Sequence, residues 1–178
     1  SSDLIDEGAL TTVRRISFIG NSEFSDSELR DEIQTAESRW YGFLTTDDTY
    51  DPDRLAFDRE LLRRFYLAEG YADFRVISAI AELTPDREEF FITFTVEEGE
   101  RYQFGTIDIQ TVLPDLDTEG LRDELLTESG DWYSSETVEE SIVNLTDAVG
   151  DLQYAFVDVE PQVERRREER LINITYLI

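Results

Sequence analysis

Carboxylates are the only side chains numerous enough in this sequence to suggest chemistry. The 178 residues include 42 Asp and Glu against 16 basic residues, all of them Arg, and they include no His and no Cys. A chain without His and Cys has no catalytic triad, no thiol nucleophile, no disulfide and no zinc site of the usual ligands. The chemistry that remains open is hydrolysis by paired carboxylates or calcium binding by carboxylate oxygens.

An acidic cluster at residues 47–53 resembles a calcium loop only superficially. It contains Asp47, Asp48, Asp51 and Asp53, but its spacing lacks the Gly and the closing Glu of an EF-hand. We therefore expect a solvated loop in which Asp51 caps a following helix, and we expect no metal and no cofactor. A calcium-binding module or a carboxylate enzyme remains an alternative of a different functional class, although nothing in the sequence places two carboxylates in one cleft.

The net charge of −26 argues against nucleic acid as a partner, because phosphate binding needs clustered basic residues. The one basic cluster, Arg165–Arg167 with Arg170, lies among glutamates, and we expect it to form a solvated hairpin turn. With 40% apolar residues the chain is not a disordered acidic tail. No apolar run approaches the roughly 18 residues that a membrane-spanning helix requires.

An internal repeat supplies the elements that must position any site. The alternating segment Val13–Phe18 recurs as Phe104–Ile109 at an offset of 91 residues, and each copy precedes an amphipathic helical segment. Ser25 and Glu28 have the spacing of a capping box before the first of these helices. Second helices are expected from Asp51 to Gly70 and from about Ser134 onward.

Two further strands complete each copy, so the order is β-α-α-β-β twice. We expect the second strands to begin at Tyr71 and Tyr154, and the third strands to run over 91–96 and 171–176. The predicted fold class is α+β, with two tandem modules that each pair a three-stranded mixed sheet with two helices. The expected modules are residues 10–99 and 100–178. Residues 1–9 are expected to be the end of a preceding module, because Ile5–Gly8 mirrors Val96–Gly99 at the same offset, and the chain would then be a fragment of a stiff tandem array.

The second strands are expected at sheet edges, because the third strands are the more apolar and should be central. The first module's edge strand has a run without charge or Pro, whereas its counterpart at 157–164 is charged at alternate positions and contains Pro161. Charges and Pro block an edge, so only the first edge is open to an added strand. A neighbouring module that buries the run is the alternative. The candidate edge residues are Val76, Ile77, Ser78, Ala79, Ile80, Ala81 and Leu83.

An insertion at residues 41–49 gives the first module a possible second contact surface. Its aromatic and apolar residues could bind a partner, or they could cap the helix pair of their own module. The candidate residues are Trp40, Tyr41, Phe43 and Leu44.

The first module resembles a POTRA domain. The resemblance rests on the motif Phe18–Asn21, on Leu62, Tyr66 and the triplet at 70–72, and on the tail Val96–Gly105. The turn at 83–86 strengthens the resemblance, which extends from Val13 to the end of the chain. The first module resembles the third POTRA domain of bacterial outer-membrane assembly factors, and the second module resembles the fourth. The second module departs from the pattern, with Thr111 where Gly20 would repeat and Gln153 where Gly70 would repeat.

This resemblance implies a non-enzymatic periplasmic scaffold that precedes a membrane β-barrel. In the family, POTRA domains bind unfolded outer-membrane proteins and accessory lipoproteins, partly by strand addition, and the edge implicated in such pairing maps to residues 73–83 here. The expected partners therefore also include neighbouring POTRA domains and a C-terminal barrel. A POTRA pair of a related secretion or translocation transporter is the alternative within the same structural class.

Overall fold

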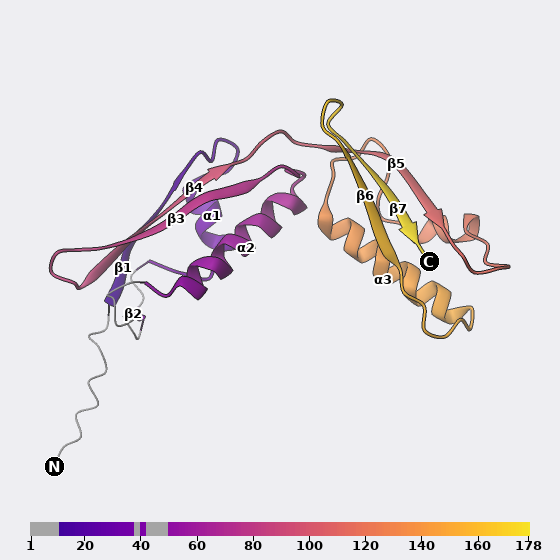
Figure 1. Cartoon of the computed structure of the whole chain (residues 1–178), viewed down its shortest axis with the longest axis horizontal. Helices are drawn as coiled ribbons and strands as arrows, with labels where there is room; N and C mark the ends of the chain where they lie inside the picture. The colour runs from indigo at the N-terminus through magenta and orange to yellow at the C-terminus, as the bar shows by residue number, and fades with distance from the viewer. Residues whose placement is uncertain (1–10, 38–39, 42–49) are drawn as a thin grey trace, which may run out of the picture. The chain divides into compact units, whose positions relative to one another are not determined.

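The computed structural model describes residues 11–37, 40–41 and 50–178, with residues 40 and 41 described by their backbone only. The chain divides into two compact units. The first comprises Ser1–Phe65 and Asp73–Glu98, and the second comprises Tyr66–Ala72 and Gly99–Ile178. Each unit is a small α+β structure with helices packed against a mixed sheet (Figure 1). The expected end of a preceding module at residues 1–9 lies outside the described residues.

The sheet of the first unit has the strand order β2-β1-β4-β3. Strand β4 lies between β1, to which it is parallel, and β3, to which it is antiparallel, as the greater apolar content of β4 predicts. The two-residue strand β2 was not predicted. The elements of this unit are β1 (Thr11–Ile19), α1 (Asp26–Glu32), β2 (Trp40–Tyr41), α2 (Pro52–Ala68), β3 (Arg75–Leu83) and β4 (Glu89–Glu97).

Strict alternation in β4 explains why one face of this sheet is covered. Phe90, Ile92, Phe94 and Val96 are all buried, whereas the residues between them are half-buried or exposed. Successive side chains of a strand point to opposite faces, so the buried set forms one continuous apolar surface. Leu29 of α1 and Leu62 of α2, both fully buried, complete the core on that side.

The sheet of the second unit has the order β5-β7-β6, with β7 parallel to β5 and antiparallel to β6. The predicted fold class is confirmed, with one difference in this unit. The first helical segment is a 3-10 helix rather than an α-helix, and its buried residue is Leu121. The elements are β5 (Gln103–Gln110), η1 (Glu119–Glu124), α3 (Ser135–Asp151), β6 (Glu160–Arg166) and β7 (Leu171–Leu177).

Local signals set the helix ends as predicted. Ser25 and Glu28 form a reciprocal capping box at α1, and Ser134 caps α3 by accepting a hydrogen bond from the backbone N–H of Thr137. Gly70 follows α2 with a φ of +99°, and Gln153 takes the equivalent place after α3 with a φ of +69°. The left-handed conformation is therefore kept in both repeats, at a steric cost in the second.

The two second strands begin later than the sequence pattern indicates. Tyr71 does not open a strand, because its backbone N–H bonds to the carbonyl of Tyr66 at 2.9 Å and closes the end of α2. Strand β6 begins at Glu160 rather than at Tyr154, since Gln153 and Phe156 both have positive φ values that interrupt an extended chain. The aromatic pattern was correct in marking equivalent positions but wrong in marking strand starts.

Buried polar groups repeat between the two units. Asp58 accepts a 2.9 Å hydrogen bond from the backbone N–H of Gln34, and Ser141 accepts one of the same length from Leu126. Both acceptors are completely buried on the longer helix of their unit, and both hold the segment that follows the shorter helix. Polar side chains thus fix the same connection in each repeat.

Candidate strand-pairing edge

Strand β3 forms one edge of the first sheet. Its one strand partner among the described residues is β4, so one side of its backbone is left without a ladder. All seven candidate edge residues lie in this strand. The sequence prediction of an edge at this place agrees with the strand order.

A β-bulge divides β3 into two parts. Val76 pairs with Val96 and Ser78 pairs with Thr95, so Ile77 is an extra residue without a partner. From Ser78 to Leu83 the register is regular. Bulges twist an edge and hinder pairing, so the regular six residues are the part best suited to accept another strand.

The side chains of β3 offer a surface without charge from Val76 to Ala81. Ile77 and Ile80 are 54% and 51% exposed, whereas the small residues Ala79 and Ala81 are half-buried. Arg75 and Glu82 are the charged residues of the strand. A strand laid beside β3 would place side chains next to the two exposed isoleucines, where cross-strand apolar pairs are favourable.

Strand β6, an edge of the second sheet, has the opposite character. All seven of its residues are exposed, Pro161 stands within it, and four of the others are charged. The predicted difference between the two edges is therefore present in their chemistry. Both the missing N–H of proline and the charges oppose the addition of a further strand.

The second candidate surface falls mostly outside the described residues. Trp40 and Tyr41 form β2, which pairs antiparallel with β1 through Thr12 and Thr11. Phe43 and Leu44 lie outside the described residues, as do Asp47 and Asp48. Among the described residues, no group of acidic side chains is arranged to hold a metal ion.

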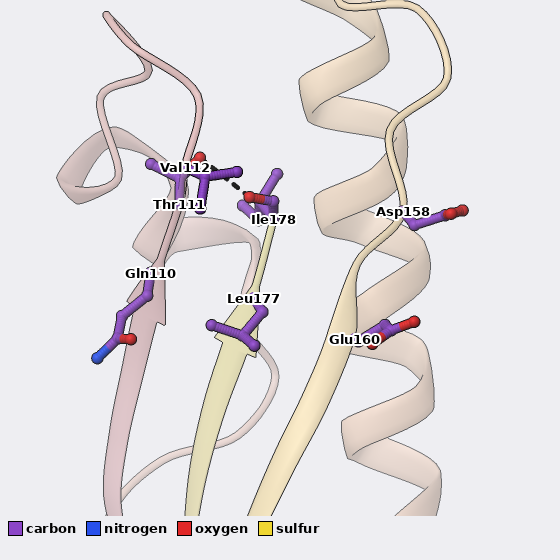
Figure 2. Close-up of a pocket in the computed structure, with 7 residues that line it drawn as sticks. All are labelled: Gln110, Thr111, Val112, Asp158, Glu160, Leu177 and Ile178. Carbon is purple, nitrogen blue, oxygen red and sulfur yellow. Dashed lines mark hydrogen bonds between the residues drawn. The ribbon is translucent and has the colours of Figure 1, made fainter.

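A cavity of about 340 Å³ opens at one end of the second sheet. Figure 2 shows Thr111 at the end of β5 bonded to the carbonyl oxygen of Ile178, while Asp158 and Glu160 point away from these strand ends. The two carboxylates that line the cavity therefore do not converge on a common point. This arrangement does not have the geometry of a carboxylate pair for hydrolysis.

Two carboxyl groups and one tyrosine hydroxyl have displaced pKa values, and all three serve local structure. The backbone hydrogen bond from Ser25 lowers the pKa of Glu28, and the hydroxyl of Thr84 lowers the pKa of Asp86 in the turn between β3 and β4. Burial raises the pKa of Tyr176, whose hydroxyl shares a 2.9 Å hydrogen bond with Thr127. The first two groups belong to a cap and a turn, and the third belongs to the core.

Comparison with known proteins gives a clear relationship. The family model POTRA, described as surface antigen variable number repeat, matches residues 11–99 and 102–178. The outer membrane protein assembly factor BamA of Neisseria meningitidis serogroup B is 25% identical over 169 residues, which cover 95% of this chain and 21% of that protein. BamA of Neorickettsia risticii is 26% identical over 172 residues, with 97% and 23% covered. The chain thus spans about a fifth to a quarter of the curated relatives it matches.

Solved structures share the fold. The crystal structure of Haemophilus influenzae BamA POTRA3-5 matches with a TM-score of 0.78 at 18% identity, covering 98% of this chain and 68% of that one. Haemophilus ducreyi BamA lacking POTRA domains 1-3 matches with a TM-score of 0.66 at 18% identity, covering 94% of this chain and 29% of that one. The expectation of two tandem POTRA modules is confirmed.

These relationships also settle the class of the chain. It is a non-enzymatic scaffold region from the periplasmic part of an outer-membrane protein. Within the described residues no helix is both long and apolar enough to span a bilayer. The chain belongs to the POTRA family.

Proposed function

We propose that this chain is a polypeptide-binding scaffold of an outer-membrane β-barrel assembly machine. Its partners would be unfolded outer-membrane proteins and accessory lipoproteins, and in the full-length protein also neighbouring POTRA domains and a C-terminal membrane β-barrel. The names of the BamA relatives support the setting. The observation that carries the binding role is the regularly paired edge Ser78–Leu83, in which Glu82 is the one charged residue.

Strand addition is the binding mode that this edge favours. An extended segment beside Ser78–Leu83 would use the main-chain groups that point away from β4, and main-chain bonding accepts many sequences. Each such hydrogen bond contributes about 0.5–1.5 kcal/mol, and each cross-strand apolar pair contributes about 0.2–1 kcal/mol. Set against the cost of association, these terms give an affinity weaker than about 1 μM. Weak, sequence-tolerant binding suits a scaffold that must release its substrate.

The binding role is tested by placing charge on the edge without touching the core. Ile77→Lys/Ile80→Lys introduces two solvated ammonium groups at exposed positions of β3. Val163→Lys is a matched control, because Val163 is 53% exposed on β6. Binding of a fluorescent strand peptide from an outer-membrane protein should fall at least fivefold in the double variant and stay unchanged in the control. Thermal unfolding of both variants should match the parent, and unchanged peptide binding in the double variant would refute the role of β3.

A further inference from the structure

A groove of about 450 Å³ runs between α2 and the start of β3, entirely within the first unit. Helix α2 forms one wall, and the first residues of β3 form the other. Its charged lining is mostly basic in a chain whose net charge is −26. The residues that matter are Arg59, Glu60, Arg63, Phe74, Arg75 and Val76.

The three guanidinium groups of the groove are not equally neutralised. Arg63 pairs with Glu60 at 3.2 Å, and Arg75 pairs with Glu97 at 2.8 Å. Arg59 forms no ion pair with any described residue, and its only hydrogen bond there is a long one of 3.5 Å to the carbonyl oxygen of Val76. A guanidinium with unused donors beside two further arginines favours a carboxylate ligand.

The position of Arg59 indicates which kind of carboxylate fits. Its guanidinium reaches the main-chain oxygen of Val76, so it lies at the level of the β3 backbone. A strand added beside β3 would have its own main chain at the same level. The charged group is therefore placed to meet a main-chain carboxylate at the end of an added strand.

The direction of the added strand decides which of its ends reaches the groove. Antiparallel pairs are more common and slightly more stable per residue than parallel pairs. A segment that pairs antiparallel with Ser78–Leu83 has its C-terminal end beside Val76 and Arg75, where the groove begins. The bulge at Ile77 ends the regular ladder at that point, which suits a chain that stops there.

We propose that this groove binds the free C-terminal carboxylate of an extended polypeptide that lies antiparallel on β3, with Arg59 as its principal ligand and Arg63 and Arg75 supporting it. The proposal rests on the binding role of β3 and adds to it a direction and an end group. The apolar side chains of Phe74 and Val76 would contact the last residue of the bound chain. In a chain whose net charge is −26, a locally basic groove reduces the repulsion that a carboxylate would meet on an acidic surface.

The experiment compares three nine-residue peptides of alternating Val and Thr, each acetylated and labelled at the N-terminus. One ends in a free carboxylate, the second in an amide, and the third is amidated but has Asp as its last residue. Anisotropy titrations use the full chain, Arg59→Gln, and the control Arg64→Gln. Arg64 is exposed on the same helix and pairs with Glu60, but it does not line the groove.

The free acid should bind the parent chain and Arg64→Gln about three- to tenfold more tightly than the amide, because charge-assisted hydrogen bonds at an exposed site are of that size. In Arg59→Gln the acid and the amide should bind equally. Equal binding of acid and amide to the parent, with both lost in the Ile77→Lys/Ile80→Lys variant, would overturn the carboxylate site and keep the binding role of β3. Binding of the Asp peptide as tight as the acid would overturn the assignment to a chain end. Binding of none of the peptides would refute both proposals.

Discussion

Gly20 lies against the carbonyl oxygen of Val96 so closely that a Cβ atom at this position would come within 2.1 Å of it. Its φ of +94° is also unfavourable for any residue with a side chain. In the other unit Thr111, at the repeat-equivalent position, instead donates its hydroxyl to the carbonyl of Ile178 at 3.1 Å. The same junction between a first strand and a last strand is thus closed by contact in one repeat and by a hydrogen bond in the other.

Gly20→Ala should therefore destabilise the first unit by at least about 2 kcal/mol, since strain and a clash with backbone act together. Gly130→Ala is the matched control, because Gly130 has a similar φ of +92° but no atom within 4 Å of the added Cβ. It should cost only about 1 kcal/mol. The free energy of unfolding of each unit, measured by hydrogen exchange across a urea titration, gives the loss caused by each of the two variants. Equal losses would show that the close approach to Val96 is unimportant.

Asp58→Ala should destabilise the first unit by about 2 kcal/mol, because one buried and one partly buried backbone N–H group lose their acceptor. These belong to Gln34 and Thr35, at 2.9 and 3.4 Å from Oδ1. Ser141→Ala removes one such acceptor and should cost the second unit about 1 kcal/mol. The measurement is the denaturant midpoint of each unit. A loss confined to the wrong unit, or none in Asp58→Ala, would contradict this account.

The second unit should lose stability at alkaline pH through Tyr176. Burial raises the pKa of this hydroxyl in the folded state, so folding favours the protonated form. The contribution is fully present below the unfolded pKa of about 10 and is lost as the pH rises through the higher folded pKa. Unfolding free energy should thus fall steeply above about pH 10. In Tyr176→Phe this part of the slope should disappear, and an identical slope would assign it to other groups.

Replacing the residues of β6 that hinder strand pairing should create a second sheet edge that can pair with another chain. Pro161→Thr/Glu164→Thr restores a backbone donor and deletes a charge on a strand whose residues are all exposed. Unprotected edges pair with other chains, so the variant should form dimers or larger species at concentrations where the parent does not. Sedimentation velocity checks this, with Glu169→Thr in the following turn as control. A variant that sediments like the parent would mean that Pro161 and Glu164 do not guard the edge.

Much of the fold could be predicted because its signals are local. The capping box at Ser25 and the alternation of Phe90 to Val96 depend on neighbours in the sequence, and the structure confirms both. The repeat then indicated which strand is central and which is an edge. These features need only the chain's periodicity and its cap residues.

The parts that could not be predicted depend on distant contacts or on single backbone angles. No residue type near Gln153 or Phe156 marks them as left-handed, so the sequence pattern predicts a start of β6 at Tyr154, six residues before the observed start at Glu160. The role of Asp58 requires that α2 pack beside residue 34. Likewise Arg59 and Arg75 line one groove only because α2 and β3 form its two walls.

The central claim, that β3 accepts an added strand, is tested most directly by amide hydrogen exchange of the full chain with and without a saturating strand peptide. An added strand protects the main-chain N–H groups of β3 that otherwise face solvent. Exchange should slow within Ser78–Leu83 and remain unchanged within Glu160–Arg166. Unchanged exchange in β3 at saturation, or equal slowing in both strands, would contradict the account.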